Sequence, residues 1–276
     1  MEYLKPVSRK ELHLLLKKKG KNLRLLAGGT DLLVRIRHGK ESPALIVDLK
    51  GIRGFDKISS NKKFISIGPC VTLQAIAEHD EIRRNFPALA EASRSVGSWQ
   101  IRNRAPLAGN ICNASPAADT LPVLVLYDAR VKLSHSGRRR ILSMKRFLTG
   151  PGKSALRPDE YLSEIRLPLP GEKRVLFEKF SRRKGLDLST VSLAAGIFGR
   201  RNRVRLAIGA CAPIVKRQTE AEDFLNEHGL QDKDLELACS LLQLSPITDL
   251  RGKAAFRRHI AARLVVATMK KLREDR

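Results

Sequence analysis

The chain has 276 residues, a formal net charge of +25 and a hydrophobic content of 42%. This length gives room for one large domain or two domains with a sizeable core, and the apolar content is that of a globular protein rather than a disordered one. The longest apolar run, Leu121 to Tyr127, contains a proline and is far too short to cross a membrane. The charged N-terminal start, broken by a proline, is not typical of a signal peptide. We therefore expect a soluble, cytoplasmic protein.

The positive charge is spread along the chain, with short clusters at residues 17–19, 138–140 and 200–201. A strongly basic chain attracts polyanions. Aromatic residues make up only 5% of the chain and do not alternate with the basic clusters, so a stacking platform for single strands is missing. We expect the charge to help hold an anionic cofactor and dock other subunits, and we do not expect nucleic acid to be the main partner.

No spacing of cysteines or histidines predicts a metal site in this chain. The four cysteines Cys70, Cys112, Cys211 and Cys239 lie far apart, without the close pairs of zinc or iron–sulfur sites. We expect them to be reduced thiols. The motifs of hydrolase nucleophiles and zinc proteases are also missing. The chain is therefore expected to carry no catalytic side chain of its own, and the chemistry to belong to a cofactor.

The first hundred residues are predicted to alternate strands and helices. Ser8 and Glu11 form a capping box for a helix that ends at residues 17–20. A buried strand over 23–27 leads into a glycine turn, and a short helix over 31–38 begins at that turn. Strands over 44–49 and 64–68 and helices over 72–79 and 88–96 complete this part.

The segment 101–120 is predicted to be a long functional loop. It is rich in small and polar residues and shows no helical or strand period. Loops of this length are uncommon in compact domains and are usually functional. Its Gly-Asn and Ser-Pro steps expose backbone N–H groups and short polar side chains, which suits a bound phosphate or ribityl chain.

The rest of the chain predicts two mixed sheets with helices. A helical stretch over 122–127 is followed by strands over 129–133, 140–143 and 160–167, with a Pro/Gly-rich connection over 151–158. The Pro/Gly step at 168–171 is the expected domain boundary. Beyond it we expect strands over 175–180, 191–198 and 204–211 and helices over 218–228, 232–242 and 252–272. The last helix places Phe256, Ile260, Leu264 and Thr268 on one face, with Val265 and Met269 adjoining and a basic face opposite. This order predicts an α+β fold in both domains.

The adjacent glycines Gly28 and Gly29 suit the binding of a pyrophosphate. Without a Cβ, glycine lets backbone N–H groups approach an anion closely and adopt positive φ. The following helix N-terminus favours negative charge, and Thr30 adds a hydroxyl. The pattern is neither a dinucleotide fingerprint nor a P-loop. Taken alone, a plain tight turn would also explain it.

Together, the glycine turn and the 101–120 segment resemble the two FAD-binding loops of the flavoprotein subunit of molybdenum hydroxylases. This family includes xanthine dehydrogenase and carbon monoxide dehydrogenase. The first loop comprises Ala27, Gly28, Gly29, Thr30, Asp31 and Leu32, and the second comprises Pro106, Leu107, Ala108, Gly109 and Asn110. The family usually has Thr-Ile-Gly-Gly-Asn at the second loop, so Pro106 and Ala108 are departures. Because proline deletes an N–H, FAD affinity would fall if the loop uses that donor and would not change otherwise.

The resemblance implies an FAD-binding domain over 1–171, with subdomains of about 1–57 and 58–171. A smaller α+β domain with a three-stranded sheet and helices would follow over 172–276, where Ser245–Gly252 looks like the family's C-terminal domain. By the same resemblance the two loops hold the pyrophosphate, and Asp119 of the turn that begins at Ser115 supports the flavin. Leu162 would touch the surroundings of the isoalloxazine or the adenine, and Lys179 would lie near the flavin ring.

The function implied is that of an electron-transfer subunit, and so of an oxidoreductase subunit. A large subunit would hold the molybdenum cofactor and a small subunit the iron–sulfur clusters, in a hetero-oligomer such as a dimer of heterotrimers. Electrons would pass from those clusters through FAD to NAD or another acceptor. Two alternatives stay open: a stand-alone flavin-dependent reductase on the same fold, and a basic binding protein that has lost FAD.

Overall fold

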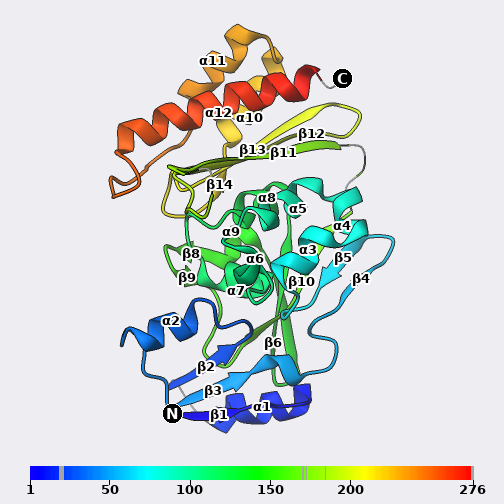
Figure 1. The fold of residues 1–276 in the computed structure, drawn as a ribbon. Helices are drawn as coiled ribbons and strands as arrows, with labels where there is room; N and C mark the ends of the chain where they lie inside the picture. Colours follow the sequence, from blue (N-terminus) through cyan, green and yellow to red (C-terminus); the bar gives the residue numbers. More distant parts are fainter. Residues whose placement is uncertain (19–21, 170, 172, 184, 275–276) are drawn as a thin grey trace.

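The computed structural model describes residues 1–18, 22–169, 171, 173–183 and 185–274. The elements form three tiers stacked along the long axis of the molecule (Figure 1). The N-terminus lies in the lower tier and the C-terminal helix lies at the top. Each tier is built around its own cluster of buried hydrophobic side chains.

The lower tier is a small parallel sheet with one helix packed against it. Its strands, in the order β1-β3-β2, are β1 (Glu2–Leu4), β3 (Leu45–Asp48) and β2 (Leu23–Leu26). Helix α1 (Arg9–Lys18) buries Leu12 and Leu16 in this core. The predicted capping box forms in part, since Ser8 Oγ accepts from Glu11 N, whereas the Glu11 carboxylate accepts from Val7 N, one residue before the N–H of the cap. The predicted end of this helix at Gly20 lies outside the described residues.

The middle tier is an antiparallel sheet covered by short helices. The strands, in sheet order, are β4 (Ile58–Ser60), β5 (Phe64–Ile67), β10 (Tyr161–Pro168), β6 (Arg130–His135) and β7 (Arg138–Ser143). The helices are α3 (Leu73–Glu78), α4 (Asp80–Asn85), α5 (Pro87–Arg94), α6 (Trp99–Arg102), α7 (Leu107–Asn113), α8 (Thr120–Leu126) and α9 (Met144–Phe147). A hairpin of β8 (Leu148–Gly150) and β9 (Lys153–Ser154) lies in the segment predicted to be a connection.

The prediction of an unstructured loop over 101–120 is wrong in part. The end of α6 and all of α7 lie within it. Leu107 and Ile111, one helical turn apart, are both fully buried in the core of the middle tier. Short helices gain most of their stability from such tertiary packing and little from intrinsic propensity. Two apolar residues in a stretch of small and polar ones gave too weak a periodicity to predict α7.

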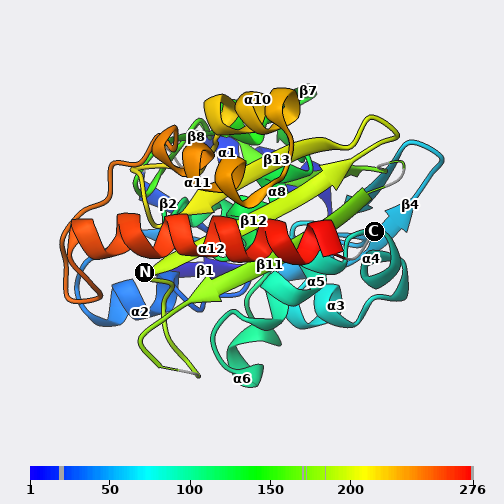
Figure 2. The ribbon, with the colours of Figure 1, turned by 90° about the horizontal axis from the view of Figure 1, so that it is seen from above.

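The upper tier is an antiparallel sheet with helices on its outer face. Its strands are β11 (Lys173–Phe180), β12 (Val191–Phe198), β13 (Arg203–Gly209) and the two-residue edge strand β14 (Lys216–Arg217). The predicted sheet of three strands is therefore corrected to four. The covering helices are α10 (Thr219–His228), α11 (Asp232–Ser240) and α12 (Ala254–Glu274), and α12 crosses the sheet (Figure 2).

Strand β12 joins the two larger cores because both of its faces are buried. Val191, Leu193 and Ala195 belong to the core beneath the outer helices, whereas Ala194 belongs to the core of the middle tier. The alternation of faces along a strand explains this division. The inner face of the sheet packs on α8 and α5, so the upper and middle tiers share a continuous apolar contact.

The predicted face of the last helix is confirmed at Val265, Thr268 and Met269 and is turned by about one residue in its first half. The side chains of α12 that are buried are Arg257, Ala261, Val265, Thr268, Met269 and Leu272. Phe256, which was predicted to be on the buried face, is 44% exposed. A buried arginine in the apolar stripe hides the true face from a hydrophobicity pattern. Among the described residues, no helix has both the length and the apolar character that crossing a membrane requires.

Candidate functional site

The glycine turn of the lower tier lies directly against the second predicted loop. A Cβ on Gly28 would lie 2.1 Å from the carbonyl oxygen of Arg104 and 2.4 Å from Cδ of Pro106. Gly29 has a φ of +81°, and its Cβ would lie 2.8 Å from a methyl group of Leu33. Glycine is therefore required at both positions by the backbone itself. The two loops, about eighty residues apart in the sequence, form one structure.

The remaining residues of the first loop lead into helix α2 (Leu32–Arg37). Asp31 is exposed and forms a 3.6 Å ion pair with Arg35. Ala27 and Thr30 are half-buried. Helix α2 has no buried residue, so it is held mainly through the turn at its N-terminal end. The predicted helix over 31–38 is confirmed.

The second loop is pinned at the start and in the middle of α7. Leu107 N donates to Val71 O at 3.1 Å, and Leu107 is fully buried, so its side chain belongs to the core. Asn110 Oδ1 accepts a 2.6 Å hydrogen bond from the Thr120 hydroxyl. Pro106 precedes the helix, with its Cδ facing Gly28. The N–H groups of Ala108 and Gly109 stand in the first turn of α7, where helices have no internal acceptor.

A cavity of about 380 Å³ lies where these segments meet β10. Four of the predicted site residues line it: Ala27, Ala108, Gly109 and Leu162. The other lining residues are Leu23, Arg24, Leu25, Leu49, Pro69, Cys112, Leu156, Arg157, Pro158, Glu160 and Tyr161. Mostly apolar walls with a few polar groups are typical of cofactor sites. Cys112 lies in the 101–120 segment that carries the resemblance but was not singled out, and the sequence gave no signal for Arg24 or Arg157, because neither stands in a recognisable motif.

Asp119 and Lys179 form a buried ion pair between the middle and upper tiers. The Asp119 carboxylate lies 2.7 Å from Lys179 Nζ, and Ser189 Oγ donates to it at 2.5 Å. Ser95 adds a longer hydrogen bond from its hydroxyl to Asp119 and accepts from Lys179 through its carbonyl oxygen. The structure thus brings together two residues that were predicted separately. Ser95 and Ser189 were missed, since isolated serines carry no pattern.

Burial raises the pKa of Asp119 above the usual carboxyl range. The Lys179 ammonium and the hydroxyls of Ser189 and Ser95 oppose this effect. A carboxylate removed from water disfavours its charged form, and an adjacent cation restores part of the balance. The charge on Asp119 therefore depends on Lys179, and the two side chains form one electrostatic unit.

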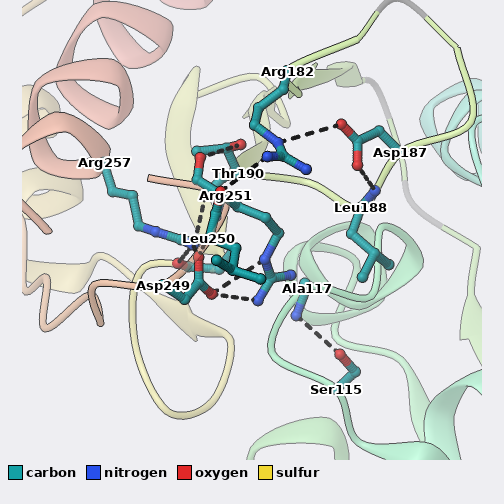
Figure 3. A network of polar contacts seen from close by, with 11 residues as sticks. Ser115, Ala117, Arg182, Asp187, Leu188, Thr190, Asp249, Leu250, Arg251 and Arg257 are labelled. Atoms are coloured by element: carbon teal, nitrogen blue, oxygen red, sulfur yellow. Dashed lines mark hydrogen bonds and ion pairs between the residues drawn. The ribbon is translucent and has the colours of Figure 1, made fainter. Parts of the chain in front are cut away.

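Ser115 lies at a second, smaller cavity of about 240 Å³, beside the loop 245–252. Its Oγ accepts a 3.3 Å hydrogen bond from Ala117 N, and this turn lies below Leu188 and Arg251 in Figure 3. Ala210 N donates to Pro116 O at 2.7 Å, which ties the turn to the upper tier. Five of the fifteen predicted site residues therefore line one of these two cavities, four the larger and Ser115 the smaller, whereas the other ten, including the Asp119–Lys179 pair, line neither.

Arg257 organises the loop 245–252 from inside the upper tier (Figure 3). Its side chain is 1% exposed, donates to the carbonyl oxygens of Thr190 and Ala210, and pairs with Asp249 at 2.6 Å. Asp249 also pairs with Arg251 at 2.7 Å. Hydrogen bonds from Arg251 lower the pKa of Asp249 to about 2. Burial opposes this shift, and a hydrogen bond from Arg257 adds to it. The carboxylate thus stays ionised and holds the loop against Arg257.

Comparison with known proteins identifies the family of this chain. Residues 1–170 match the family model described as the FAD binding domain in molybdopterin dehydrogenase, and residues 176–272 match that of the CO dehydrogenase flavoprotein C-terminal domain. The xanthine dehydrogenase FAD-binding subunit of Escherichia coli O157:H7 is 32% identical over 245 residues, covering 86% of this chain and 84% of that protein.

Solved structures of the same group superpose closely on this chain. Carbon monoxide dehydrogenase of Hydrogenophaga pseudoflava, in a form that lacks the Mo-pyranopterin moiety, matches with a TM-score of 0.92 at 26% identity over 97% of this chain and 95% of that chain. Quinoline 2-oxidoreductase of Pseudomonas putida 86 matches with a TM-score of 0.93 at 25% identity over 100% and 97%. The predicted family, the fold class and the assignment to oxidoreductase subunits are confirmed. The chain belongs to the FAD-binding medium subunits of the molybdenum hydroxylase family, the family of xanthine and carbon monoxide dehydrogenases.

Proposed function

We propose that this FAD-binding subunit passes electrons from iron–sulfur clusters on a partner subunit, through FAD, to NAD or another acceptor. The observation that carries the proposal is the meeting of three separately predicted segments at one cavity. Ala27, the first turn of α7 and Leu162 all line it. The cavity is assembled from two tiers, as expected for an extended dinucleotide rather than a small substrate.

The residues present fit the dinucleotide part of FAD. The contact of Gly28 with Arg104 and Pro106 leaves no room for a side chain between the loops. Backbone N–H groups of Ala108 and Gly109 lie in the first turn of α7, where a pyrophosphate is favoured by hydrogen bonding. Apolar walls from Leu23, Leu25 and Leu162 suit a flat ring. The ring of Pro106 faces Gly28. We therefore propose that the phosphates are bound without a backbone donor at position 106, so that Pro106 does not weaken FAD binding.

The Asp119–Lys179 pair is proposed to stand near the flavin ring. When bound, FAD supplies the exchange between one-electron carriers and a two-electron acceptor. Lys179 holds positive charge at a fixed point because Asp119 and the Ser95 carbonyl oxygen orient its ammonium group. Asp119 in turn is fixed by Ser189. We propose that this charge stabilises a reduced, more negative flavin.

We also propose partners and a domain division. Relatives are named as the medium subunit of nicotine 6-hydroxylase and the medium chain of carbon monoxide dehydrogenase. These names support a large subunit with the molybdenum cofactor and a small iron–sulfur subunit beside this chain, in a hetero-oligomer. The division of the chain into 1–171 and 172–276, with a subdomain border near 57, is supported by the separate sheets of the three tiers, whose strands lie within residues 2–48, 58–168 and 173–217.

The test of the electron route is anaerobic reduction of the FAD-loaded chain. We expect NADH to bleach the flavin absorbance near 450 nm if NAD is the acceptor, because the transfer is reversible, and dithionite to bleach it in either case. The Asp119→Asn variant tests the role of the ion pair, and we expect NADH to bleach its flavin more slowly. Bleaching by dithionite alone would mean that NAD is not the acceptor.

Co-purification distinguishes the two alternatives. Recovery of this chain with larger molybdenum- and iron-containing chains supports the proposal. A flavoprotein that reduces a small substrate without any partner would favour the stand-alone reductase. A colourless monomer that refuses added FAD and retards nucleic acid would favour the basic binding protein.

A further inference from the structure

A third cavity, the hairpin cavity, opens beside the hairpin of β6 and β7. Two of its lining residues also line a cavity described above, and the other five do not. Its volume is about 290 Å³, and every residue that lines it is charged or titratable: His135, Arg138, Arg139, Arg140, Arg157, Asp159 and Glu160. Only Arg157 and Glu160 also line the cavity proposed for FAD. A concave site lined this way needs a counter-charge.

Of the two carboxylates of this cavity, Glu160 is paired with an arginine and Asp159 lies beside a histidine. Glu160 accepts hydrogen bonds from Arg140 at 2.7 and 2.8 Å and from the backbone N of Arg157 at 3.0 Å. Asp159 lies 3.4 Å from His135 Nδ1. Among the residues that the structure describes, the guanidinium groups of Arg138, Arg139 and Arg157 have no carboxylate within ion-pair distance. These three groups outnumber Asp159, the one lining carboxylate that is not paired with an arginine, so the concavity carries a net positive charge.

Helix α1 adds further positive charge on the same side of the molecule. The β6 strand runs down to α1 in Figure 1. Burial, followed by the charges of His135, Arg9, Arg139 and Lys17, lowers the pKa of His13 on that helix. His13 therefore senses both the hairpin and its own helix. Converging charges of one sign in a concave surface attract anions more strongly than the same charges on a flat one.

We propose that this cavity binds a small phosphate-bearing molecule. Planar guanidinium groups donate pairs of hydrogen bonds that match the oxygens of a phosphate. Among the described residues that line the cavity there is no Phe, Tyr or Trp, so a single-stranded nucleic acid would find little base-stacking surface there. The shared chemistry is a phosphate group, which a free ion or a nucleotide could supply.

The test is isothermal titration calorimetry on the FAD-saturated chain, at fixed ionic strength. Saturation with FAD blocks the proposed dinucleotide cavity, so any remaining binding reports on the hairpin cavity. Inorganic phosphate and AMP are the two probes. The probe that reaches one bound molecule per chain at the lower concentration identifies the source of the phosphate group. We expect the double variant Arg138→Gln/Arg139→Gln to weaken binding at least tenfold. These side chains are exposed, so the variant is expected to fold.

The matched control is Arg258→Gln/Arg263→Gln, which removes the same charge from two exposed positions of α12. Equal weakening in both double variants would mean that only net charge matters and would overturn the proposal. Binding of a single-stranded RNA oligonucleotide without binding of either probe would also overturn it. If the chain does not take up FAD, the same titrations on the free chain still decide, because Arg138 and Arg139 do not line the FAD cavity.

Discussion

The Asp119 carboxylate and Lys179 Nζ lie 2.7 Å apart, although sixty residues separate them in the sequence. Asp119 comes from the start of α8 in the middle tier and Lys179 from β11 in the upper tier. Their side chains are 6% and 12% exposed. The pair therefore links the two tiers at the point where the flavin ring is proposed to lie.

Breaking this pair should cost stability in a recognisable pattern. We expect Asp119→Asn and Lys179→Met to lower the free energy of unfolding by about 3 kcal/mol each, because each leaves a buried charge without its partner. The double variant should lose less than the sum of the two. Urea unfolding of the four proteins measures the coupling. Strictly additive losses would show that the pair is not an electrostatic unit.

Gly28 should not tolerate the smallest side chain. A methyl group there meets the backbone oxygen of Arg104, which cannot move aside as a side-chain end could. We expect Gly28→Ala to destabilise the chain by about 1 to 3 kcal/mol and to weaken FAD binding at least tenfold, because the loops are forced apart. Gly150→Ala is the control, since its Cβ would lie 3.8 Å from Lys153. Full flavin binding by Gly28→Ala would remove the glycine turn from the site.

Arg257 should be the most sensitive arginine of α12. We expect Arg257→Ala to lower the free energy of unfolding by about 3 to 5 kcal/mol, since Asp249 and two carbonyl groups lose their partner inside the fold. The neighbouring exposed Arg258→Ala should change it by less than about 0.5 kcal/mol. Thermal unfolding of both variants provides the comparison. Similar losses at the two positions would contradict the buried network.

Acid should weaken the middle sheet through Glu164. Burial raises the pKa of this residue, but hydrogen bonds from Arg166, Lys132 and Ser66 outweigh burial and bring the pKa to about 2. The folded state therefore binds fewer protons than the unfolded chain between about pH 4.5 and pH 2. The stabilisation, at most about 3 kcal/mol, is complete above that window and is lost as the pH falls through it.

Glu164→Gln should accordingly flatten the fall in unfolding free energy over the same window. The control is Glu227→Gln, an exposed position in α10, which should leave the pH dependence unchanged. The measurement is urea unfolding at pH 5, 4 and 3. A Glu164→Gln protein with the parental pH dependence would assign the acid sensitivity to other carboxylates.

Much of the fold was predictable because its elements carry strong local patterns. The capping box of α1, the Thr72 cap of α3 and the apolar runs of β3 and β12 each specify an element without help from distant residues. Elements of two to four residues, such as β1, α9 and β14, were missed because they depend on pairing or packing with distant segments. The turned face of α12 follows from the same limit, since the burial of Arg257 depends on Asp249.

The candidate site was predictable only as residues, not as an arrangement. Motif resemblance singled out Gly28, Asp119 and Lys179, but their positions depend on three tiers meeting. The sequence gave no sign that Pro106 would pack its ring on Gly28 or that Ser189 would hold Asp119. The cavity walls from Leu23 and Tyr161 are ordinary strand residues whose role appears only when the strands are in place.

The most direct test is the visible absorption spectrum of the purified chain, with the released cofactor identified after denaturation. We predict a flavin spectrum with close to one FAD per chain, either as isolated or after incubation with FAD. We also predict its loss in the Gly29→Val and Asp119→Ala variants. A colourless chain that does not take up added FAD would contradict the proposed cofactor site.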